Sequence, residues 1–330
     1  MIRRPPRSTQ GVSSAASDVY KRQEKLSKFA ISAEEFGFHS IWAADHIALP
    51  VEETDLYPYT DDGRFTANFE DPQLDAFTLL SFVASQTTQI KLGTSVVIVP
   101  YRNPIVQAKM FASLDVLTEG RVICGVGVGW WKQEFEALNA PFKDRGLATD
   151  EYLQIFKLLW NTNKSEFQGK TYEFSGIAFF PKPVQKPKGI PIWVGGHTRR
   201  AVRRTIKFGD VWHPTRLSPD QIESMLPYIR EQCKEYDRNI DEISISLKRT
   251  LHFTDIGIET NSKARSQAAL IDSTAAIIED IKKCEQLGIT QLTFDFQTSE
   301  LDECIRIMEH LADICLLYTS DAADDTPCVD

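Results

Sequence analysis

An aspartate and a histidine stand together in WAADHIALP (residues 42–50). The apolar run FHSIWAAD has the composition of a buried strand, so Asp45 and His46 fall at its carboxyl end. A histidine exchanges a proton near neutral pH, as general acid–base catalysis requires. A hydrogen-bonded structural role is the alternative for His46. We take the pair as the candidate catalytic residues.

A second segment, VGGHTRR (residues 194–200), joins two glycines to the start of a helical pattern. The free N–H groups and the dipole of that helix favour an anion in front of Thr198, with Arg199 beside it. The alternative is that the basic residues form a solvated helix face. Contact with nucleic acid is disfavoured, because no aromatic residues are interleaved and the net charge is −9.

Three glycines alternate along RVICGVGVG, at positions 125, 127 and 129. A dinucleotide-binding loop has the spacing G-x-G-x-x-G, which this segment lacks. A spacing of two is the period of a strand, so the glycines leave one face without side chains. That face permits the close approach of a flat ligand, and room for packing within a barrel is the alternative.

Apolar strands and amphipathic helices alternate along the chain. Seven strand patterns are each followed by a helix: FHSIWAAD, IKLGTSVVIV, RVICGVGVG, IPIWVGG, DVWHP, ISISLKRTLHF and TQLTFDF. This alternation indicates a parallel sheet covered by helices. A (β/α)8 barrel needs eight strands, and the absent one is the first. We therefore expect an α/β TIM barrel with its first strand missing and its active site at the carboxyl ends of the strands.

About sixty residues separate the fourth and fifth strands of this barrel, more than one crossover requires. Within them EYLQIFKLLW predicts an amphipathic helix, and SEFQGKTYEFSG predicts a hairpin. Insertions on this side of a barrel lie at the catalytic face. We expect a lid or pocket wall, with a dimer surface as the alternative.

The two ends of the chain do not follow the pattern of the interior. DVYKRQ (residues 18–23) and CLLYTS (residues 315–320) can be encoded by DNA strings that are reverse complements, as a sequencing adapter joined to both ends of a gene fragment would be. Such scars are excluded from fold reasoning. We divide the chain into a non-native tail (residues 1–23), one TIM-barrel domain (residues 24–314) and a second non-native tail (residues 315–330).

Composition narrows the class of protein. A net charge of −9 disfavours nucleic acids and anionic membranes as partners. No apolar run approaches the roughly 20 residues of a membrane-spanning helix, so the expected location is the cytoplasm. The six cysteines include no CxxC pair, which predicts buried free thiols rather than a metal site or a disulfide framework.

Together these segments resemble the luciferase-like monooxygenase superfamily. The resemblance rests on ordered motifs across residues 24–314: WAADHIALP, LGTSVVIVPYRNP, RVICGVGVGWWKQEFEAL, DEYLQIFKLLW, FQGKTYEF, PKPVQKP and PIWVGGHTRRA. The second and third motifs are most similar to the branch that uses the deazaflavin coenzyme F420. The resemblance implies an oxidoreductase that moves a hydride between C5 of F420 and a small organic substrate, with homodimers usual in the family. An FMN-dependent monooxygenase that uses dioxygen is the alternative.

The family also implies roles for individual residues. Its flat cofactor ring lies against a bulge that often contains a non-proline cis peptide bond, which here would join Ser95 and Val96. His46 is the implied proton donor or acceptor, with Asp45 beside it. The residues implied in cofactor binding are Asp45, Ser95, Val96, Gly127, Val128, Gly129, Gly195, Gly196, His197, Thr198 and Arg199.

One position departs from the sugar-phosphate dehydrogenases of the family. They carry an acidic glutamate directly after the strand-four glycines, where this chain has Trp130. A hexose phosphate is therefore disfavoured as the substrate, and Trp130 with Trp131 favours an apolar or aromatic one. A non-catalytic cofactor-binding protein and an unrelated phosphosugar enzyme are the remaining alternatives.

Overall fold

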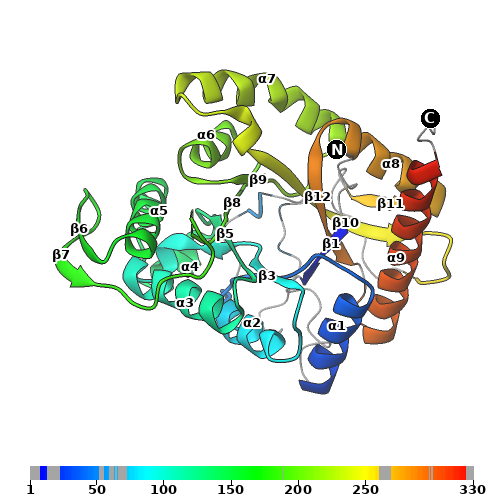
Figure 1. Ribbon diagram of the computed structural model, residues 1–330, viewed down its shortest axis with the longest axis horizontal. Helices are drawn as coiled ribbons and strands as arrows, with labels where there is room; N and C mark the ends of the chain where they lie inside the picture. The colour runs from blue at the N-terminus through cyan, green and yellow to red at the C-terminus, as the bar shows by residue number, and fades with distance from the viewer. Residues whose placement is uncertain are drawn as a thin grey trace, which may run out of the picture.

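A closed barrel of parallel strands forms the centre of the protein (Figure 1). The computed structural model describes residues 8–12, 23–51, 56–58, 63, 65, 73–187, 189–259, 269–296, 298 and 300–324. Within these residues the eight barrel strands, in order, are β1 (Ser8–Val12), β2 (Ser40–Ala43), β3 (Lys91–Thr94), β5 (Val122–Gly127), β8 (Ile192–Gly195), β9 (Val211–His213), β10 (Ser244–Phe253) and β12 (Ile289–Phe296). Pairing of β10 with β9 closes the ring. The predicted TIM barrel and its seven predicted strands are therefore confirmed.

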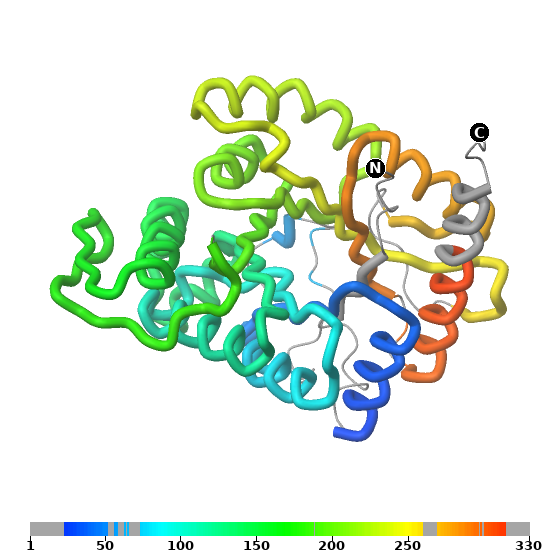
Figure 2. The backbone as a smooth tube through the Cα atoms, viewed as in Figure 1, coloured from blue at the N-terminus to red at the C-terminus, as the bar shows by residue number. Residues whose placement is uncertain are grey.

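Helices cover the outside of the barrel. They are α1 (Gln23–Glu35), α2 (Ala76–Ala84), α3 (Pro104–Leu117), α6 (Arg199–Phe208), α7 (Pro219–Glu235), α8 (Thr274–Gln286) and α9 (Leu301–Asp324). Asn103, Thr198, Ser218 and Ser273 cap α3, α6, α7 and α8 by accepting backbone N–H groups of the first turns. Figure 2 shows α9 beside α1, where Lys28 pairs with a carboxylate of α9 at 3.0 Å. No helix in the described ranges is long and apolar enough to cross a membrane.

Large apolar side chains fill the inside of the barrel. The rings of Trp42 and Trp193 lie 4.8 Å apart, and Ile123 and Val211 complete this cluster. Trp42 needs a small neighbour, because a Cβ at Gly93 would fall 2.3 Å from its ring. The thiols predicted to be free and buried are confirmed for Cys124, Cys233, Cys284 and Cys304.

A strand occupies the first position of the barrel, so the expectation that the first strand is missing is wrong. Ser8–Val12, within the segment predicted to be a non-native tail, pairs in parallel with both β12 and β2. The open edges of two strands need backbone partners, and any extended segment supplies them whatever its side chains. Helix α9 likewise continues past residue 314. The boundaries of the native domain remain a prediction.

The insertion contains the predicted helix and hairpin. Its elements are α4 (Lys132–Ala137), α5 (Arg145–Asn161), β6 (Lys164–Gln168) and β7 (Glu173–Ala178). Glu151 of α5 holds the hairpin by accepting the N–H groups of Lys170 and Thr171 at 2.6 and 2.8 Å. The hairpin projects away from the barrel (Figure 1). The expected lid is therefore wrong for the hairpin, whereas residues 143–147 of the insertion do line the barrel cavity.

The smaller elements connect these layers. They are β4 (Val97–Ile98), β11 (Leu270–Asp272) and the 3-10 turns Val99–Tyr101 and Ile240–Glu242. β4 pairs with β5 beyond the bulge that follows β3. This arrangement directs the loop after β3 across the end of the barrel.

Candidate active site

A cavity of about 750 Å³ lies at the carboxyl ends of the barrel strands. Every residue that the sequence singled out for catalysis or cofactor binding contributes to its wall: Asp45, His46, Ser95, Val96, Gly127, Val128, Gly129, Gly195, Gly196, His197, Thr198 and Arg199. They come from the loops and strand ends of β2, β3, β5 and β8. Closure of the barrel thus brings together segments that are far apart in the sequence.

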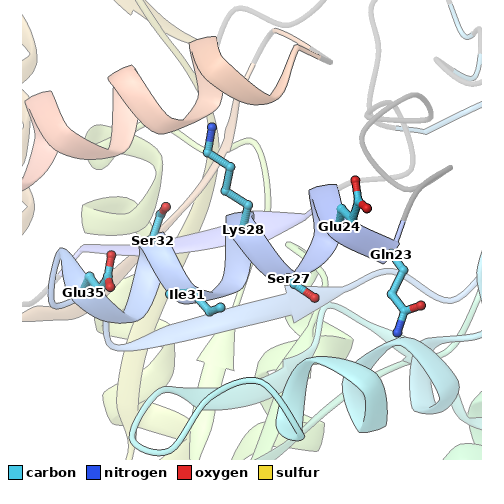
Figure 3. A pocket seen from close by; sticks show the side chains of 7 residues that line it. All are labelled: Gln23, Glu24, Ser27, Lys28, Ile31, Ser32 and Glu35. Carbon is cyan, nitrogen blue, oxygen red and sulfur yellow. The ribbon is translucent and has the colours of Figure 1, made fainter.

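A second hollow, along α1, lacks converging groups. Figure 3 shows its seven labelled side chains, all carried by this one helix. Among the described residues, no three or more His, Cys, Asp or Glu side chains gather in a way that could hold a metal ion. The barrel cavity is therefore the candidate active site.

Tight packing builds the cavity wall beside β3 and β5. The peptide bond between Ser95 and Val96 is cis, as the resemblance implies. The side chain of Val96 occupies the space beside two glycines. A Cβ atom added at Gly127 would lie 2.5 Å from this side chain, and one added at Gly195 would lie 2.8 Å from it. At these two positions the space is filled by the protein itself. This finding favours the packing alternative for the alternating glycines.

The end of the cavity beside α6 is rich in positive charge. Residues 197–201, which run from the loop before α6 into its first turn, line it, so the positive end of the helix dipole faces the cavity. Arg145 is held there by donating to the carbonyl oxygen of Gly129 at 3.2 Å. Burial lowers the pKa of His197, which leaves it neutral at pH 7. The other basic side chains around this end are Lys143, Arg199, Arg200 and Arg204.

Two of the predicted site residues, Asp45 and Arg199, contact other side chains of this protein. The fully buried carboxylate of Asp45 accepts two hydrogen bonds from Arg102, each 2.7 Å, and one from the N–H of Ile98 at 3.0 Å. Burial alone would lower the pKa of Arg102, but its carboxylate partners raise it, so the pair is ionic. The guanidinium of Arg199 lies 4.8 Å over the ring of Tyr228. These contacts favour an anchoring role for Asp45 over a proton-transfer role.

A buried carboxylate that the sequence reasoning missed lies behind His46. Nδ1 of His46 is 2.9 Å from Oε2 of Glu134. Oε1 of Glu134 accepts the N–H groups of Ile47 and Ala48 at 2.6 and 3.2 Å, and the hydroxyl of Tyr101 donates to Oε2 at 2.9 Å. Burial raises the pKa of Glu134, but the contact with His46 and the other donors lower it by more. The sequence signal that could have identified Glu134 is an acidic residue in the first turn of a helix that begins just after the end of a strand.

A second histidine, His213, was also missed, although it lies within the predicted strand DVWHP and is the last residue of β9. Its Nε2 lies 3.0 Å from Oγ of Ser95, and its Nδ1 lies 2.6 Å from Oγ of Ser246. Burial, and then the charge of Lys248, lower the pKa of His213 to about 3. Lys248 itself is paired with Asp295 at 3.4 Å. His213 therefore stays neutral and supports the loop after β3.

We expect His213 to make the fold sensitive to acid. The unfolded chain binds a proton at this histidine near pH 6.5, whereas the folded protein binds it only near pH 3. Because the unfolded state gains the proton first, the free energy of unfolding falls as the pH drops below 6.5. From pH 7 to pH 5 the loss is about 2 kcal/mol. Urea unfolding at both pH values should show a smaller loss for His213→Gln, and equal losses would contradict this role.

Aromatic rings form another part of the wall, next to His46. Trp130 and Trp131 stack with their centroids 4.6 Å apart, and Tyr57 lies 5.0 Å from Trp130. Phe65 contacts the His46 ring edge-on at 4.9 Å. Trp130, Tyr57 and Phe65 all line the cavity. The site thus offers an apolar surface beside a titratable imidazole.

Comparisons with known proteins identify relatives of the chain. The sequence model described as luciferase-like monooxygenase matches residues 5–304. An uncharacterised protein of Mycobacterium tuberculosis is 32% identical over 206 residues, which cover 62% of this chain and 70% of the relative. The F420-dependent glucose-6-phosphate dehydrogenase of Kineococcus radiotolerans is 28% identical over 253 residues, which cover 74% of this chain and 69% of the relative.

A solved structure shares the fold. It is described as an F420-dependent secondary alcohol dehydrogenase in complex with an F420-acetone adduct, and it matches with a TM-score of 0.73 and 17% identity over 94% of this chain and 99% of that chain. At this identity the likeness concerns the barrel alone. With a family model that matches most of its length, the chain belongs to the luciferase-like monooxygenase family and is an oxidoreductase.

Proposed function

We propose that the protein transfers a hydride between coenzyme F420 and a small organic substrate. The observation that carries this proposal is the convergence of His46, the Ser95–Val96 bulge and the start of α6 on one cavity. The relative from Kineococcus is F420-dependent by its name, which supports the same cofactor here. F420 supplies the hydride chemistry when bound, while the protein binds and orients it and excludes water.

The basic end of the cavity fits the anionic part of F420. The N–H groups at the start of α6 and the fixed guanidinium of Arg145 are suited to a phosphate. Lys143 and Arg200 add further positive charge in a chain whose net charge is −9. FMN carries one phosphate, whereas F420 carries a phosphodiester and additional carboxylates. The number of cations therefore favours F420.

His46 is the proposed proton donor or acceptor in this reaction. Of the other titratable groups considered for that task, Asp45 is held by Arg102, and His213 is neutral and hydrogen-bonded on both ring nitrogens. His46 lines the cavity and makes its described hydrogen bond through Nδ1. Its Nε2 is then the atom available to exchange a proton with substrate or cofactor.

The aromatic wall beside His46 supports an apolar or aromatic substrate. Trp130 stands where the sugar-phosphate dehydrogenases of the family carry their acidic glutamate, and it lines the cavity with Tyr57 and Phe65. Aromatic rings bind flat apolar groups through their large contact area. We therefore propose a small aromatic or apolar compound as the substrate rather than a hexose phosphate.

An FMN-dependent monooxygenase is the second candidate function. The description of the matching family model favours it. Oxygen uptake distinguishes the two reactions, because a monooxygenase consumes dioxygen with its reduced cofactor, whereas hydride transfer from reduced F420 to an organic acceptor proceeds without it.

Reversing one charge at the rim of the cavity tests the proposed cofactor site. Arg200 is exposed and lines the basic end, so Arg200→Glu should weaken F420 binding about tenfold, the effect of roughly 1.4 kcal/mol, with less effect at high salt. Arg230→Glu is the matched control, because Arg230 is exposed on α7 and does not line the cavity. Titrations followed by F420 fluorescence measure both variants. If Arg200→Glu and Arg230→Glu bound F420 with equal affinity, this result would contradict the proposed site.

A further inference from the structure

We propose that Glu134 is a positioning residue that holds His46 in one tautomer and leaves Nε2 free to exchange protons in the cavity. This inference rests on the proposed role of His46. The side chain of Glu134 is fully buried and does not line the cavity, so Glu134 acts through His46 rather than on a substrate.

The tautomer follows from what a carboxylate can do. An ionised carboxylate accepts hydrogen bonds and donates none. Because Oε2 of Glu134 lies 2.9 Å from Nδ1 of His46, the ring hydrogen is on Nδ1. In the neutral imidazole Nε2 is then an acceptor. Within the described residues Nε2 has no hydrogen-bond partner, and it is the nitrogen on the far side of the ring from Glu134.

The same carboxylate also fixes the loop that carries the imidazole. Ile47 and Ala48 directly follow His46, and both donate their backbone N–H groups to Oε1. The hydroxyl of Tyr101, in the 3-10 turn that follows β4, donates to Oε2. Glu134 therefore restrains the ring and its backbone together, and such a fixed orientation favours proton transfer.

The carboxylate further balances the charge that His46 acquires. When Nε2 takes up a proton, the ring becomes a cation whose Nδ1 lies 2.9 Å from Oε2. Opposite charges attract more strongly in a buried site than in water. The transferred proton is therefore taken up and released by Nε2 and does not move to Glu134. Glu134 remains ionised throughout because its pKa is lowered.

The test reads the tautomer directly in the protein without cofactor. Nitrogen-15 NMR of labelled histidine distinguishes a ring nitrogen that carries hydrogen from one that does not. The chain has six histidines, and the signal lost in His46→Gln assigns the ring of interest. We expect the Nδ1–H form in wild type. In Glu134→Gln we expect a mixture with the Nε2–H form, because the amide brings a donor to the place of an acceptor.

Glu136→Gln is the matched control. It makes the same change on the same helix, at an exposed side chain paired with Lys132, and should leave the His46 signals unchanged. An Nε2–H form in wild type would overturn the proposal, and so would an unchanged tautomer in folded Glu134→Gln. If Glu134→Gln does not fold, the wild-type spectrum still decides. Absence of F420 binding alongside an intact Nδ1–H form would overturn the proposed function while supporting the positioning role.

Discussion

Replacing Gly125 by alanine is expected to leave the protein largely unfolded. A Cβ at Gly125 would fall 1.7 Å from the backbone carbonyl oxygen of Thr94, so two central strands would have to move apart. The side chain of Thr94 also bridges these strands, accepting from the N–H of Gly125 at 3.0 Å and donating to its carbonyl oxygen at 2.6 Å. Losing this packing should cost more than about 4 kcal/mol, a large fraction of the roughly 5 to 15 kcal/mol by which an ordinary domain is stable.

Soluble yield and urea unfolding of Gly125→Ala measure this effect. Gly146→Ala is the control, because the nearest atom to its added Cβ, in the side chain of Arg204, lies at 3.6 Å, an ordinary contact. In the first turn of α5 that change should be neutral or stabilise by up to about 1 kcal/mol. An unfolding midpoint of Gly125→Ala equal to that of wild type would show that β3 and β5 do not approach as described.

Removing the imidazole of His46 should have the largest effect on activity. His46→Ala deletes the proposed proton-transfer group, which typically contributes a factor of about 10² to 10⁴ in rate. Single-turnover oxidation of reduced F420, with an acceptor found in a screen of small aromatic carbonyl compounds, measures the loss. The affinity for F420 should be retained, because the basic end of the cavity is unchanged.

A histidine outside the cavity provides the comparison. His310 lies on α9 and contacts Thr274 at 2.8 Å, so His310→Ala should leave the hydride-transfer rate unchanged. A rate for His46→Ala that equals that of wild type would remove His46 from the chemistry. A loss of F420 binding in His46→Ala would instead make His46 a cofactor-binding residue.

The barrel could be predicted because burial on both faces leaves near-continuous apolar runs in its strands. FHSIWAAD and RVICGVGVG became β2 and β5 with fully buried patterns. The strand Ser8–Val12 carries no such run and was excluded on other grounds. The position of this strand depends on backbone hydrogen bonds with β2 and β12, and no local pattern of side chains predicts such pairing.

The location of the site was predictable for a similar reason. Parallel strands end at one edge of a barrel, so Asp45, Ser95, Gly127 and Gly195 had to meet there. Their partners were not predictable. Glu134 stands 88 positions from His46. Such distant contacts pair Asp45 with Arg102 and His46 with Glu134, and spacing along the chain does not encode them.

The structure distinguishes the two interpretations of the alternating glycines in RVICGVGVG. Both close ligand approach and internal packing predict side-chain-free positions on one face. The structure fills the room beside Gly127 with Val96 and sets Gly129 at a φ of +76°, where a Cβ would fall 2.5 Å from Phe135. Both glycines still line the cavity. Packing therefore explains the glycines, and the backbone they expose remains available to a ligand.

The preference of the cavity for F420 over FMN is the most direct test of the proposed function. Equilibrium titration of the wild-type protein with each cofactor, at the same ionic strength and followed by cofactor fluorescence, yields both dissociation constants. We predict micromolar or tighter binding of F420 and binding of FMN weaker by at least about tenfold, or 1.4 kcal/mol. Tight binding of FMN without binding of F420 would contradict the account and identify a flavin-dependent monooxygenase.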